Sequence, residues 1–400
     1  MRYVLIGSWS KIGSTGKIAY NYYSYLKEKG QEVHFFYSRG ETNGEKDIIQ
    51  ISDKKNLYLH GALARLTGKQ GFFSTKETKK LIEKIKIIKP DCVYLFNLHA
   101  YYLNEFLLLD YLKKSGVNTV YMLFDEYPYL GKCCFSEGCE KFKTECKKCP
   151  KIHEYPKSLI FDRSNLIFIK KKETYAGWEN LHFAGVKYIG EQAKQSALAK
   201  NIPFHSFNMG IDLSGLYYPR DTHEIVEKYN IPVNKRIVLT VGFSSDARKG
   251  IKKYIEIARK CKDVLFINIG YDKNICVDPP ANFFPIKYVG NQLEMACFYT
   301  LADAYVTTSS GEAMSNACLE SLACGTPIIG FNVSRMSYLA PAPIGTYIPY
   351  DNIDSFAEAI SNLPKKNDEI STMCRKYAEN HYDLKEFMKN LYQISETMRG

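Results

Sequence analysis

The stretch Ser309–Asn332, SSGEAMSNACLESLACGTPIIGFN, predicts a strand–loop–helix–strand unit together with the apolar run before it. That run, Ala304–Thr308, is typical of a buried strand. Small and apolar residues over Ala313–Ala323 then predict a helix, which ends at the Gly-Thr-Pro of 325–327. A second apolar run, Ile328–Asn332, follows as another strand. Such a unit is the building block of a doubly wound α/β sheet.

Glu312 and Glu320 lie eight residues apart in this unit, one in the loop and one inside the helix. A carboxylate that faces a cleft can accept hydrogen bonds from neighbouring hydroxyls of a sugar. The helix start offers backbone N–H groups and the positive end of the helix dipole to a phosphate. Because Cys318, Leu319 and Leu322 are apolar, a Glu within this helix needs a partner or a ligand. The pattern predicts recognition of a nucleotide-sugar; an exposed Glu pair is the alternative.

Strand-like and helix-like segments alternate along the chain, which predicts two doubly wound, Rossmann-like α/β domains. The first domain is expected over 1–207 and the second over 220–368. Residues 208–219 mix Gly, Asp and Pro without periodicity and are expected to connect them. Residues 369–400 predict a helical tail that packs back on the first domain. Within the first domain, residues 125–162 are rich in Cys, Lys, Tyr and Pro and predict a functional insert.

The individual elements are predicted from the apolar and periodic runs. The expected strands are Tyr3–Ile6, Glu32–Tyr37, Cys92–Phe96, Thr119–Phe124, His182–Ile189, Ile237–Gly242, Val264–Gly270, Ile286–Val289, Ala304–Thr308 and Pro327–Gly330. The expected helices are Lys17–Lys29, Thr75–Ile88, Leu103–Lys114, Glu191–Lys200, Lys252–Cys261, Gln292–Thr300 and Ala313–Ala323.

Composition narrows the class of protein. Hydrophobic content of 45% and charged content of 24% are ordinary for globular chains. The net charge of +11 fits either a lysine-rich enzyme or one that contacts phosphates or an anionic membrane surface. The basic residues are scattered, which argues against nucleic acid as a partner. No apolar run predicts a membrane span, and Met1 leads directly into a strand, so we expect a cytoplasmic protein with reduced thiols.

A glycine-rich turn over residues 7–16 follows the first predicted strand and opens the first helix. Backbone amides can approach an anion closely in such a turn. A simple tight turn is the alternative reading. The candidate binding residues are Gly13, Ser14, Thr15 and Gly16.

The equivalent turn of the second domain is VGFSSDARKG at 241–250. It ends a strand at Gly242 and carries Arg248 and Lys249 before the next helix. Arg can grip phosphate oxygens with two hydrogen bonds, and Lys adds a second positive charge. Ligands of open α/β sheets bind at the carboxyl ends of strands, where this turn lies. We therefore expect a phosphate site here, with a solvated basic loop as the alternative.

Five cysteines gather within residues 133–149 of the insert: Cys133, Cys134, Cys139, Cys146 and Cys149. The spacing Cys139-x6-Cys146-x2-Cys149, preceded by Cys133 or Cys134, supplies four thiolates, which in a reducing compartment indicates a structural zinc site. His153 is an alternative ligand. Free thiols, or disulfides in a purified sample, are the other interpretation.

The chain resembles family 4 of the retaining GT-B glycosyltransferases, and specifically a bacterial surface-polysaccharide subgroup with a Cys-rich first-domain loop. The resemblance covers nearly the whole chain. It is carried by Glu312-x7-Glu320, Ala323–Pro327, Gly13–Ala19, Arg248–Gly250, Asn208–Asp212, Asn97–Asn104 and Tyr155–Ser158.

The resemblance implies two domains facing a cleft, the GT-B architecture, and roles for single residues. Glu320 is then expected to bind the ribose and Glu312 the donor sugar, while Arg248 and Lys249 neutralise the leaving diphosphate. Amides around Met314, Ser315 and Asn316 would also face the phosphates. No metal cofactor is expected for the transfer, because cations and helix ends stabilise the leaving group.

The implied function is transfer of a sugar from a UDP- or GDP-sugar to a glycan or lipid-linked acceptor, with retention. It would act in bacterial surface polysaccharide synthesis at the inner face of the membrane. One departure matters: Phe124 stands where the family usually has a His near the donor sugar. His99 is a candidate to replace it catalytically, unless it is structural. The alternative function is a nucleotide-sugar-binding protein with weak or lost transfer.

Overall fold

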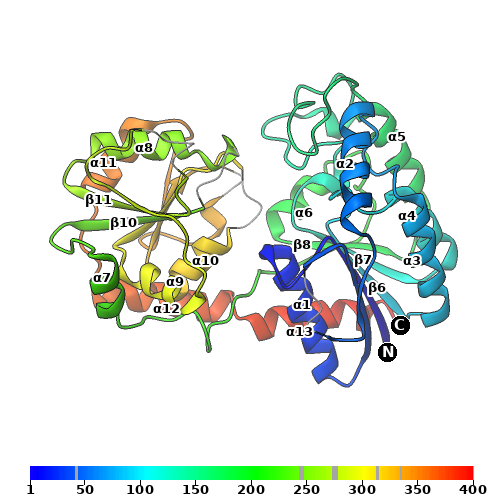
Figure 1. Cartoon of the computed structure of the whole chain (residues 1–400), viewed down its shortest axis with the longest axis horizontal. Coiled ribbons are helices and arrows are strands. Elements are labelled where there is room, and N and C mark those ends of the chain that lie inside the picture. Colours follow the sequence, from blue (N-terminus) through cyan, green and yellow to red (C-terminus); the bar gives the residue numbers. More distant parts are fainter. Residues whose placement is uncertain (41–43, 243–246, 273–277, 312–314, 334–335, 400) are drawn as a thin grey trace. The chain divides into compact units, whose positions relative to one another are not determined.

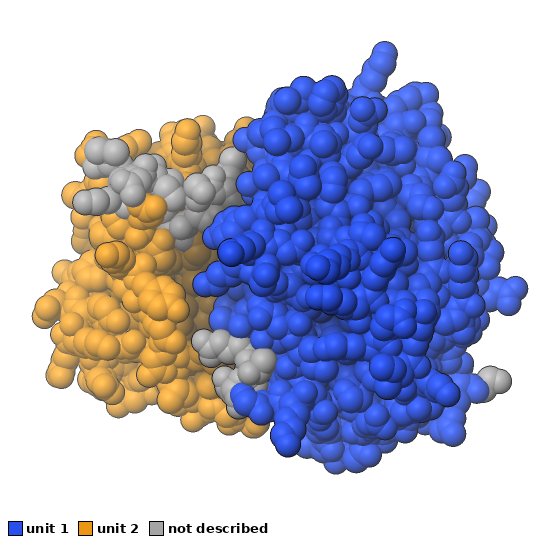
Figure 2. Space-filling model, turned by 45° about the vertical axis from the view of Figure 1, so that its right-hand side comes forward, with its two compact units in different colours: residues 1–208, 388–400 blue, residues 209–387 orange. Residues whose placement is uncertain are grey.

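The computed structural model describes residues 1–40, 44–242, 247–272, 278–311, 315–333 and 336–399 (Figure 1). The chain divides into two compact units, which Figure 2 colours separately. Unit 1 comprises Met1–Asn208 and Met388–Gly400, and unit 2 comprises Met209–Phe387. Each unit contains one large parallel sheet with helices on its faces, so the predicted α/β class is confirmed.

Unit 1 contains a seven-stranded sheet in the order β5-β3-β1-β6-β7-β8-β9. Because the chain moves outward from β1 on one side and then returns to β6 on the other, the topological switch point lies between β1 and β6. The strands are β1 (Arg2–Gly7), β3 (Glu32–Tyr37), β5 (Ile48–Gln50), β6 (Cys92–Phe96), β7 (Asn118–Leu123), β8 (Leu181–Gly185) and β9 (Phe204–Ser206); β2 (Trp9–Ser10) and β4 (Arg39–Gly40) form a separate pair.

Helices connect these strands, as the parallel pairing requires. In unit 1 they are α1 (Gly13–Glu28), α2 (Lys54–Thr67), α3 (Thr75–Ile88), α4 (Glu105–Ser115), α5 (Ser164–Tyr175) and α6 (Lys187–Ala193). The central strand β1 pairs in register with both neighbours, and its residues from Tyr3 to Ile6 are completely buried. An apolar run of this kind is typical of a strand covered on both faces.

Unit 2 repeats the design with a six-stranded sheet in the order β12-β11-β10-β13-β14-β15, so its switch point lies between β10 and β13. The strands are β10 (Arg236–Val241), β11 (Val264–Ile269), β12 (Phe283–Ile286), β13 (Ala304–Thr307), β14 (Ile328–Phe331) and β15 (Gly345–Ile348). The helices are α7 (His223–Tyr229), α8 (Ile251–Lys260), α9 (Gln292–Leu301), α10 (Asn316–Ala323), α11 (Ile353–Ser361), α12 (Asp368–His381) and the first part of α13 (Leu384–Thr397).

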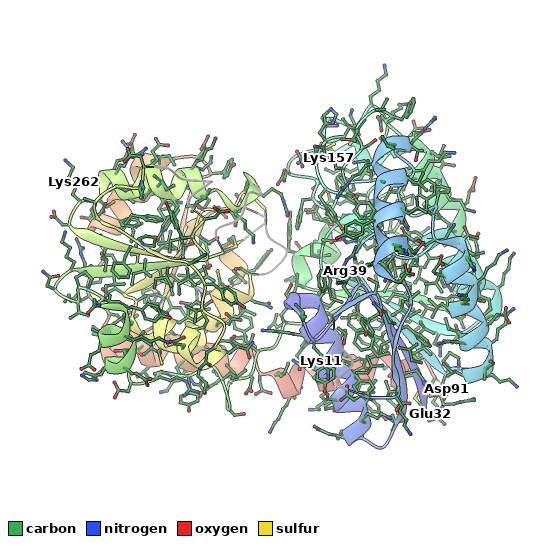
Figure 3. The ribbon with its side chains drawn as sticks, in the orientation of Figure 1. Lys11, Glu32, Arg39, Asp91, Lys157 and Lys262 are labelled. Carbon is green, nitrogen blue, oxygen red and sulfur yellow. The ribbon has the colours of Figure 1, made fainter. Side chains whose placement is uncertain are left out.

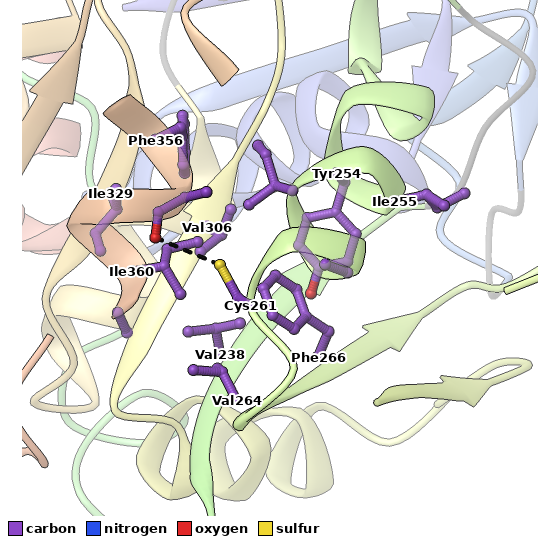
Figure 4. Packing of buried hydrophobic residues seen from close by; sticks show 14 of the residues in the cluster. Val238, Tyr254, Ile255, Cys261, Val264, Phe266, Val306, Ile329, Phe356 and Ile360 are labelled. Carbon is purple, nitrogen blue, oxygen red and sulfur yellow. Dashed lines mark hydrogen bonds between the residues drawn. The ribbon is translucent and has the colours of Figure 1, made fainter. Parts of the chain in front are cut away.

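The core of unit 2 lies where α8 and α11 pack on the sheet (Figure 4). In α8, the buried residues Ile251, Tyr254, Ile255 and Ala258 recur at helical spacing and form one apolar face. At the end of α8, the Cys261 thiol lies in the core and donates a hydrogen bond to the Ala357 carbonyl at 3.4 Å (Figure 4). The predicted helix Lys252–Cys261 is therefore confirmed, with its bounds shifted by one residue.

Three element predictions have wrong bounds or type. The predicted strand His182–Ile189 ends at Gly185, because residues 187–193 form α6. A Cβ added to Gly190 would lie 2.2 Å from the Phe204 ring, so close packing of α6 on β9 decides this segment against its strand-like sequence. The predicted helix Glu191–Lys200 correspondingly begins and ends earlier, and the predicted strand Ile286–Val289 is β12, which ends at Ile286.

The predicted insert, residues 125–162, is irregular in the structure apart from two short 3₁₀ turns, η1 (Tyr127–Tyr129) and η2 (Lys141–Lys143). The predicted tail, residues 369–400, divides between the units: α12 belongs to unit 2, and the chain from Met388 belongs to unit 1. There Tyr94 donates a hydrogen bond to the Leu391 carbonyl at 2.5 Å. Among the described residues, we find no helix that combines the length and the apolar character needed to cross a membrane.

Candidate functional site

The carboxyl edge of the unit 2 sheet joins two loops at the switch point. The loop after β13 meets the loop after β10, since the Ser310 N–H donates to the Arg248 carbonyl at 2.7 Å. The Thr308 hydroxyl lies 3.1 Å from the Lys249 carbonyl and 2.9 Å from the Gly250 carbonyl. These contacts hold Arg248 and Lys249 beside the segment that leads into α10.

Gly250 is required at this junction. Its φ of +67° is a left-handed conformation, and an added Cβ would lie 2.0 Å from the Thr308 carbonyl oxygen. The backbone before it forms the short 3₁₀ turn η3 (Ala247–Lys249), which carries both predicted phosphate-binding cations. Lys249 is exposed and Arg248 is half-buried. The two cations therefore lie at the sheet edge where ligands of such folds bind.

The start of α10 lies at the same edge. Ser315 occupies the N-cap position of this helix but its side chain makes no capping hydrogen bond, and the helix begins at Asn316. The first N–H groups of an α-helix have no partner inside the helix and can bind an anion. An N-terminal helix end beside Arg248 and Lys249 suits a phosphate or diphosphate group.

Glu320 lies in the second turn of α10, where the Tyr299 hydroxyl of α9 donates to its Oε2 at 2.8 Å. The carboxylate is half-buried, and the pKa of Tyr299 is raised by burial and by the nearby Glu320 charge. Burial likewise raises the pKa of Tyr217, with Glu320 as the next cause. The predicted need for a partner within this helix is met by Tyr299, which fixes the orientation of the carboxylate.

Glu312, Met314 and Gly242 are the other predicted binding residues of this region. Glu312 and Met314 lie outside the described residues. Gly242 has a φ of +89°, and an added Cβ would meet nothing within 4 Å, so its backbone conformation alone favours glycine.

In unit 1, the glycine turn after β1 lies against the loop after β6 at the other switch point. The Asn97 amide donates to the Thr15 hydroxyl at 3.4 Å. Gly13, with a φ of +70°, and Ser14 begin α1. A Cβ on Gly16 would lie 2.9 Å from Cβ of Trp9, so this glycine permits close packing of the turn. Packing accounts for Gly16, and the role of the other residues in binding stays a prediction.

His99 follows β6 and is 95% buried, with Nε2 3.3 Å from Asp125 Oδ2. Asp125 follows the neighbouring strand β7, and Cys134 lies in the same cluster, with the three ligand atoms all within 4.8 Å of one another. The rings of Tyr127 and Tyr155 pack around the imidazole, with centroids 4.8 and 5.6 Å away. Sequence reasoning missed the partnership with Asp125; its position directly after a strand was the available signal.

Phe124, at the family's usual His position, stacks on Phe96 with ring centroids 6.0 Å apart. An aromatic pair therefore occupies the ends of β6 and β7 beside His99. Arg39, labelled in Figure 3, donates from Nη1 to the Ala100 carbonyl at 2.9 Å and ties this loop to the end of β3. The unit 1 edge is thus filled by packed aromatic and polar side chains.

The structure divides the five predicted metal-binding cysteines into two groups. Cys133, Cys139, Cys146 and Cys149 line one small cavity, whereas Cys134 lies with His99 and Asp125. His153, the alternative ligand, hydrogen-bonds through Nδ1 to the Ser158 carbonyl at 3.1 Å.

The thiols of Cys133 and Cys149 interact directly. A hydrogen bond from Cys133 lowers the pKa of Cys149 to about 6, with burial opposing the shift. The same hydrogen bond raises the pKa of Cys133. Of this pair, Cys149 is therefore the thiol that ionises more readily.

A known protein family matches a part of the chain that lies within unit 2. Residues 221–381, within unit 2, match the family Glycosyl transferases group 1. A curated relative in Escherichia coli K12, the putative colanic acid biosynthesis glycosyl transferase WcaC, is 26% identical over 175 residues, which is 41% of this chain and 42% of the relative. The match thus spans less than half of that relative's length.

Two solved structures share the fold of the whole chain. WaaG, a glycosyltransferase involved in lipopolysaccharide biosynthesis, has a TM-score of 0.70 at 17% identity, with 100% of both chains covered. Anabaena Alr3699/HepE in complex with UDP-glucose has a TM-score of 0.66 at 13% identity, again with 100% of both chains covered. The chain therefore has the GT-B fold, and its residues 221–381 match the glycosyl transferases group 1 family.

Proposed function

We propose that this protein is a retaining, hexosyltransferase-type glycosyltransferase that moves a sugar from a UDP- or GDP-sugar to a glycan or lipid-linked acceptor. The observation that carries the proposal is the junction at the unit 2 switch point, where Arg248 and Lys249 lie beside the loop into α10. The match of residues 221–381 to the glycosyl transferases group 1 family supports it. The relative named for colanic acid biosynthesis supports a role in bacterial surface polysaccharide synthesis.

In the proposed mechanism, the diphosphate leaves with its charge neutralised by Arg248, Lys249 and the start of α10. Groups that are already held in place, as these are by Thr308 and Gly250, need no reorganisation when the charge develops. Glu320, oriented by Tyr299, would bind the ribose hydroxyls, and Glu312 the donor sugar. Such a set of cations makes a metal ion unnecessary for transfer.

The alternative function is binding of a nucleotide-sugar with weak or lost transfer. Its specific support is Phe124, whose ring stacks on Phe96 and offers no hydrogen bond to a sugar. His99, the candidate replacement, is 95% buried and bonded to Asp125. A catalytic His99 would have to reach the donor from this enclosed position.

Binding and turnover of candidate donors separate the two functions. We expect UDP or GDP to stabilise the protein against heat in proportion to ligand concentration. Lys249→Ala should weaken nucleotide binding about tenfold or more, because a charge-assisted hydrogen bond contributes about 1.5–3 kcal/mol. Lys252→Ala, an exposed lysine in the first turn of α8, is the matched control and should bind normally.

Slow hydrolysis or transfer of one donor sugar would support the transferase, and binding without turnover would support the alternative. Absence of binding by every UDP- and GDP-sugar, or equal binding by Lys249→Ala and wild type, would contradict both.

A peripheral contact with the inner face of the membrane is the second part of the proposal. Its support is the exposed apolar run Leu159, Ile160 and Phe161, which are 45%, 62% and 48% exposed. The positive charge of Arg163 lies beside this run, since its guanidinium is 5.5 Å from the Phe161 ring centroid. Apolar side chains beside a positive charge suit an anionic bilayer surface.

Co-sedimentation with vesicles tests this contact. The protein should bind vesicles that contain an anionic lipid more strongly than neutral ones, and Ile160→Asp should reduce that binding. Exposed Val233→Asp in unit 2 is the control. Equal binding by wild type and Ile160→Asp would exclude this surface.

A further inference from the structure

Four cysteines of the insert surround one cavity in unit 1. Cys133, Cys139, Cys146 and Cys149 line it, and its volume is about 20 Å³. A space of this size admits one water-sized particle and no organic ligand. We propose that these four thiolates bind a single zinc ion that holds the insert in its fold. The proposal is independent of the transfer reaction.

The backbone turns that carry the thiols have defined shapes. The Cys139 N–H donates to the Ser136 carbonyl at 3.0 Å across a turn in which Glu137 and Gly138 both have positive φ. Between Cys146 and Cys149, Lys148 also has a positive φ, of +48°. Left-handed residues between closely spaced ligands turn the chain sharply, and these turns bring both Cys139 and the Cys146–Cys149 pair to the cavity.

Hydrogen bonds fix the second turn from both sides. Lys141 Nζ donates to the carbonyls of Lys147 and Lys148 at 3.1 and 2.7 Å. The Cys149 N–H donates to Asp162 Oδ2 at 2.7 Å. The side chains of Lys141 and Asp162 therefore hold the short loop between Cys146 and Cys149. Groups that hydrogen-bond around a metal site orient its ligands in the same way.

Gly131 brings the first and third cysteines together. An added Cβ at this position would lie 2.5 Å from Cβ of Cys146 and 3.1 Å from its sulfur. Only a glycine lets Cys146 pack directly against the backbone two residues before Cys133. Coordination of one ion by the sulfurs of Cys133 and Cys146 would explain this close approach.

The charge around the cavity complements bound thiolates. A zinc ion with four thiolates carries a net charge of about −2. Lys132 is 98% buried, and its ammonium donates to backbone carbonyls, including that of Ile152 at 3.1 Å. A buried ammonium group is costly without a nearby negative charge, and the adjacent thiolates would supply it.

A metal also explains how the insert keeps its shape. Between residues 125 and 162 the described chain has only η1 and η2 as regular elements. Within residues 137–155, Phe142 is the one buried residue, so apolar packing contributes little there, and structural zinc sites supply folding free energy to such segments. Because four protein thiolates complete a tetrahedral site, no position would remain for a substrate, and the ion would be structural.

Elemental analysis of the full-length protein, purified under reducing conditions, tests the proposal. We expect one zinc per chain, and tetrahedral tetrathiolate absorption when cobalt replaces zinc. Cys139→Ser and Cys146→Ser should lower the zinc content to less than half. Cys134→Ser is the matched control, since Cys134 adjoins Cys133 in sequence but lies with His99 and Asp125; it should retain the zinc.

A second measurement does not depend on folded variants. Titration of wild-type protein with a thiol-binding mercurial should release one zinc as four thiols react. Four outcomes would overturn the proposal: no zinc after expression with added zinc, a Cys133–Cys149 disulfide in the reduced protein, a cobalt spectrum with nitrogen ligands, or zinc loss in Cys134→Ser alone.

Discussion

The carboxyl edges of the two sheets have the same topology and opposite character. Both lie at a switch point and both join two loops, β1 with β6 in unit 1 and β10 with β13 in unit 2. In unit 2 the loops are tied by one backbone hydrogen bond and by the Thr308 hydroxyl, and Arg248 and Lys249 lie at the edge. In unit 1 the edge is filled by buried side chains, among them His99 and Asp125, which are 5% and 8% exposed.

The same parallel-sheet architecture therefore supports two different kinds of carboxyl edge. In unit 2 the loop contacts are made to the backbone carbonyls of 248–250, and the basic side chains of 248 and 249 do not make them. When side chains make them, the edge gains a polar network whose members depend on one another. Substitutions at the unit 1 edge should therefore act on stability, whereas charge substitutions at the unit 2 edge should act on affinity.

The largest effect is expected from Lys171→Met in unit 1. Lys171 is completely buried, donates to the carbonyls of Tyr127 and Leu130 at 2.5 and 3.1 Å, and lies 3.4 Å from the Tyr127 ring centroid. Burial lowers its pKa, while the buried Glu105 carboxylate opposes that shift. Removing the ammonium should lower the free energy of unfolding by about 3–5 kcal/mol, measured by denaturant titration. Lys172→Met, at an exposed position, should change it by less than about 0.5 kcal/mol.

Gly250→Ala should break the junction of unit 2. Strain at φ +67° and the contact of the new Cβ with the Thr308 carbonyl should together lower the free energy of unfolding by about 2–3 kcal/mol and abolish tight nucleotide binding. Gly116→Ala has a nearly identical φ of +68° and no neighbour within 4 Å, so it should show the backbone cost alone, about 1 kcal/mol. If both variants lost the same free energy of unfolding, the contact with the Thr308 carbonyl would not contribute to the destabilisation.

Glu320→Gln should weaken UDP or GDP binding about tenfold, because the amide replaces a charged acceptor for ribose hydroxyls. Calorimetry with the nucleotide and its 2′,3′-dideoxy analogue separates this role from a structural one: the loss should vanish for the analogue. Glu358→Gln, exposed on α11, is the control. An identical loss for both ligands would assign Glu320 to packing with Tyr299.

The smallest effect is a pH dependence from His60 in α2, which packs against Tyr101 at the unit 1 edge with ring centroids 6.0 Å apart. Burial lowers the pKa of His60 from 6.5 to about 4, with the Arg39 charge as a further cause. The unfolded chain therefore binds the proton first, and stability is lost as pH falls from about 6.5 towards 4. Between pH 7 and 5.5 the free energy of unfolding should fall by about 1 kcal/mol from this group.

His60→Gln should remove that part of the acid sensitivity, measured by thermal unfolding across the same pH range. His223→Gln, whose imidazole is 92% exposed, should leave the acid profile of unit 1 unchanged. If both variants kept the full pH dependence, another group would be responsible; burial also lowers the pKa values of His182 and His205.

Local pattern predicted most of the large elements. The helix Thr75–Ile88 has the predicted bounds, as do the strands Glu32–Tyr37 and Cys92–Phe96. Errors arose where packing between distant segments decided the outcome, as at Gly190 against Phe204. The spacing of Glu312 and Glu320 and the cations of 241–250 marked the candidate site in sequence. That the loops after β10 and β13 meet follows only from the pairing of these two strands.

From the sequence alone we could infer the alternation of strands and helices, the glycine turns after the first strand of each unit, and the candidate residues for binding phosphate or metal. Which of these residues meet could be seen only in the folded chain. Sheet order is a non-local property, so it alone placed Ser310 on Arg248 and His99 on Asp125. Cys133 and Cys134 are adjacent and chemically identical. The path of the folded chain alone sends one to the cavity and the other to the His–Asp cluster.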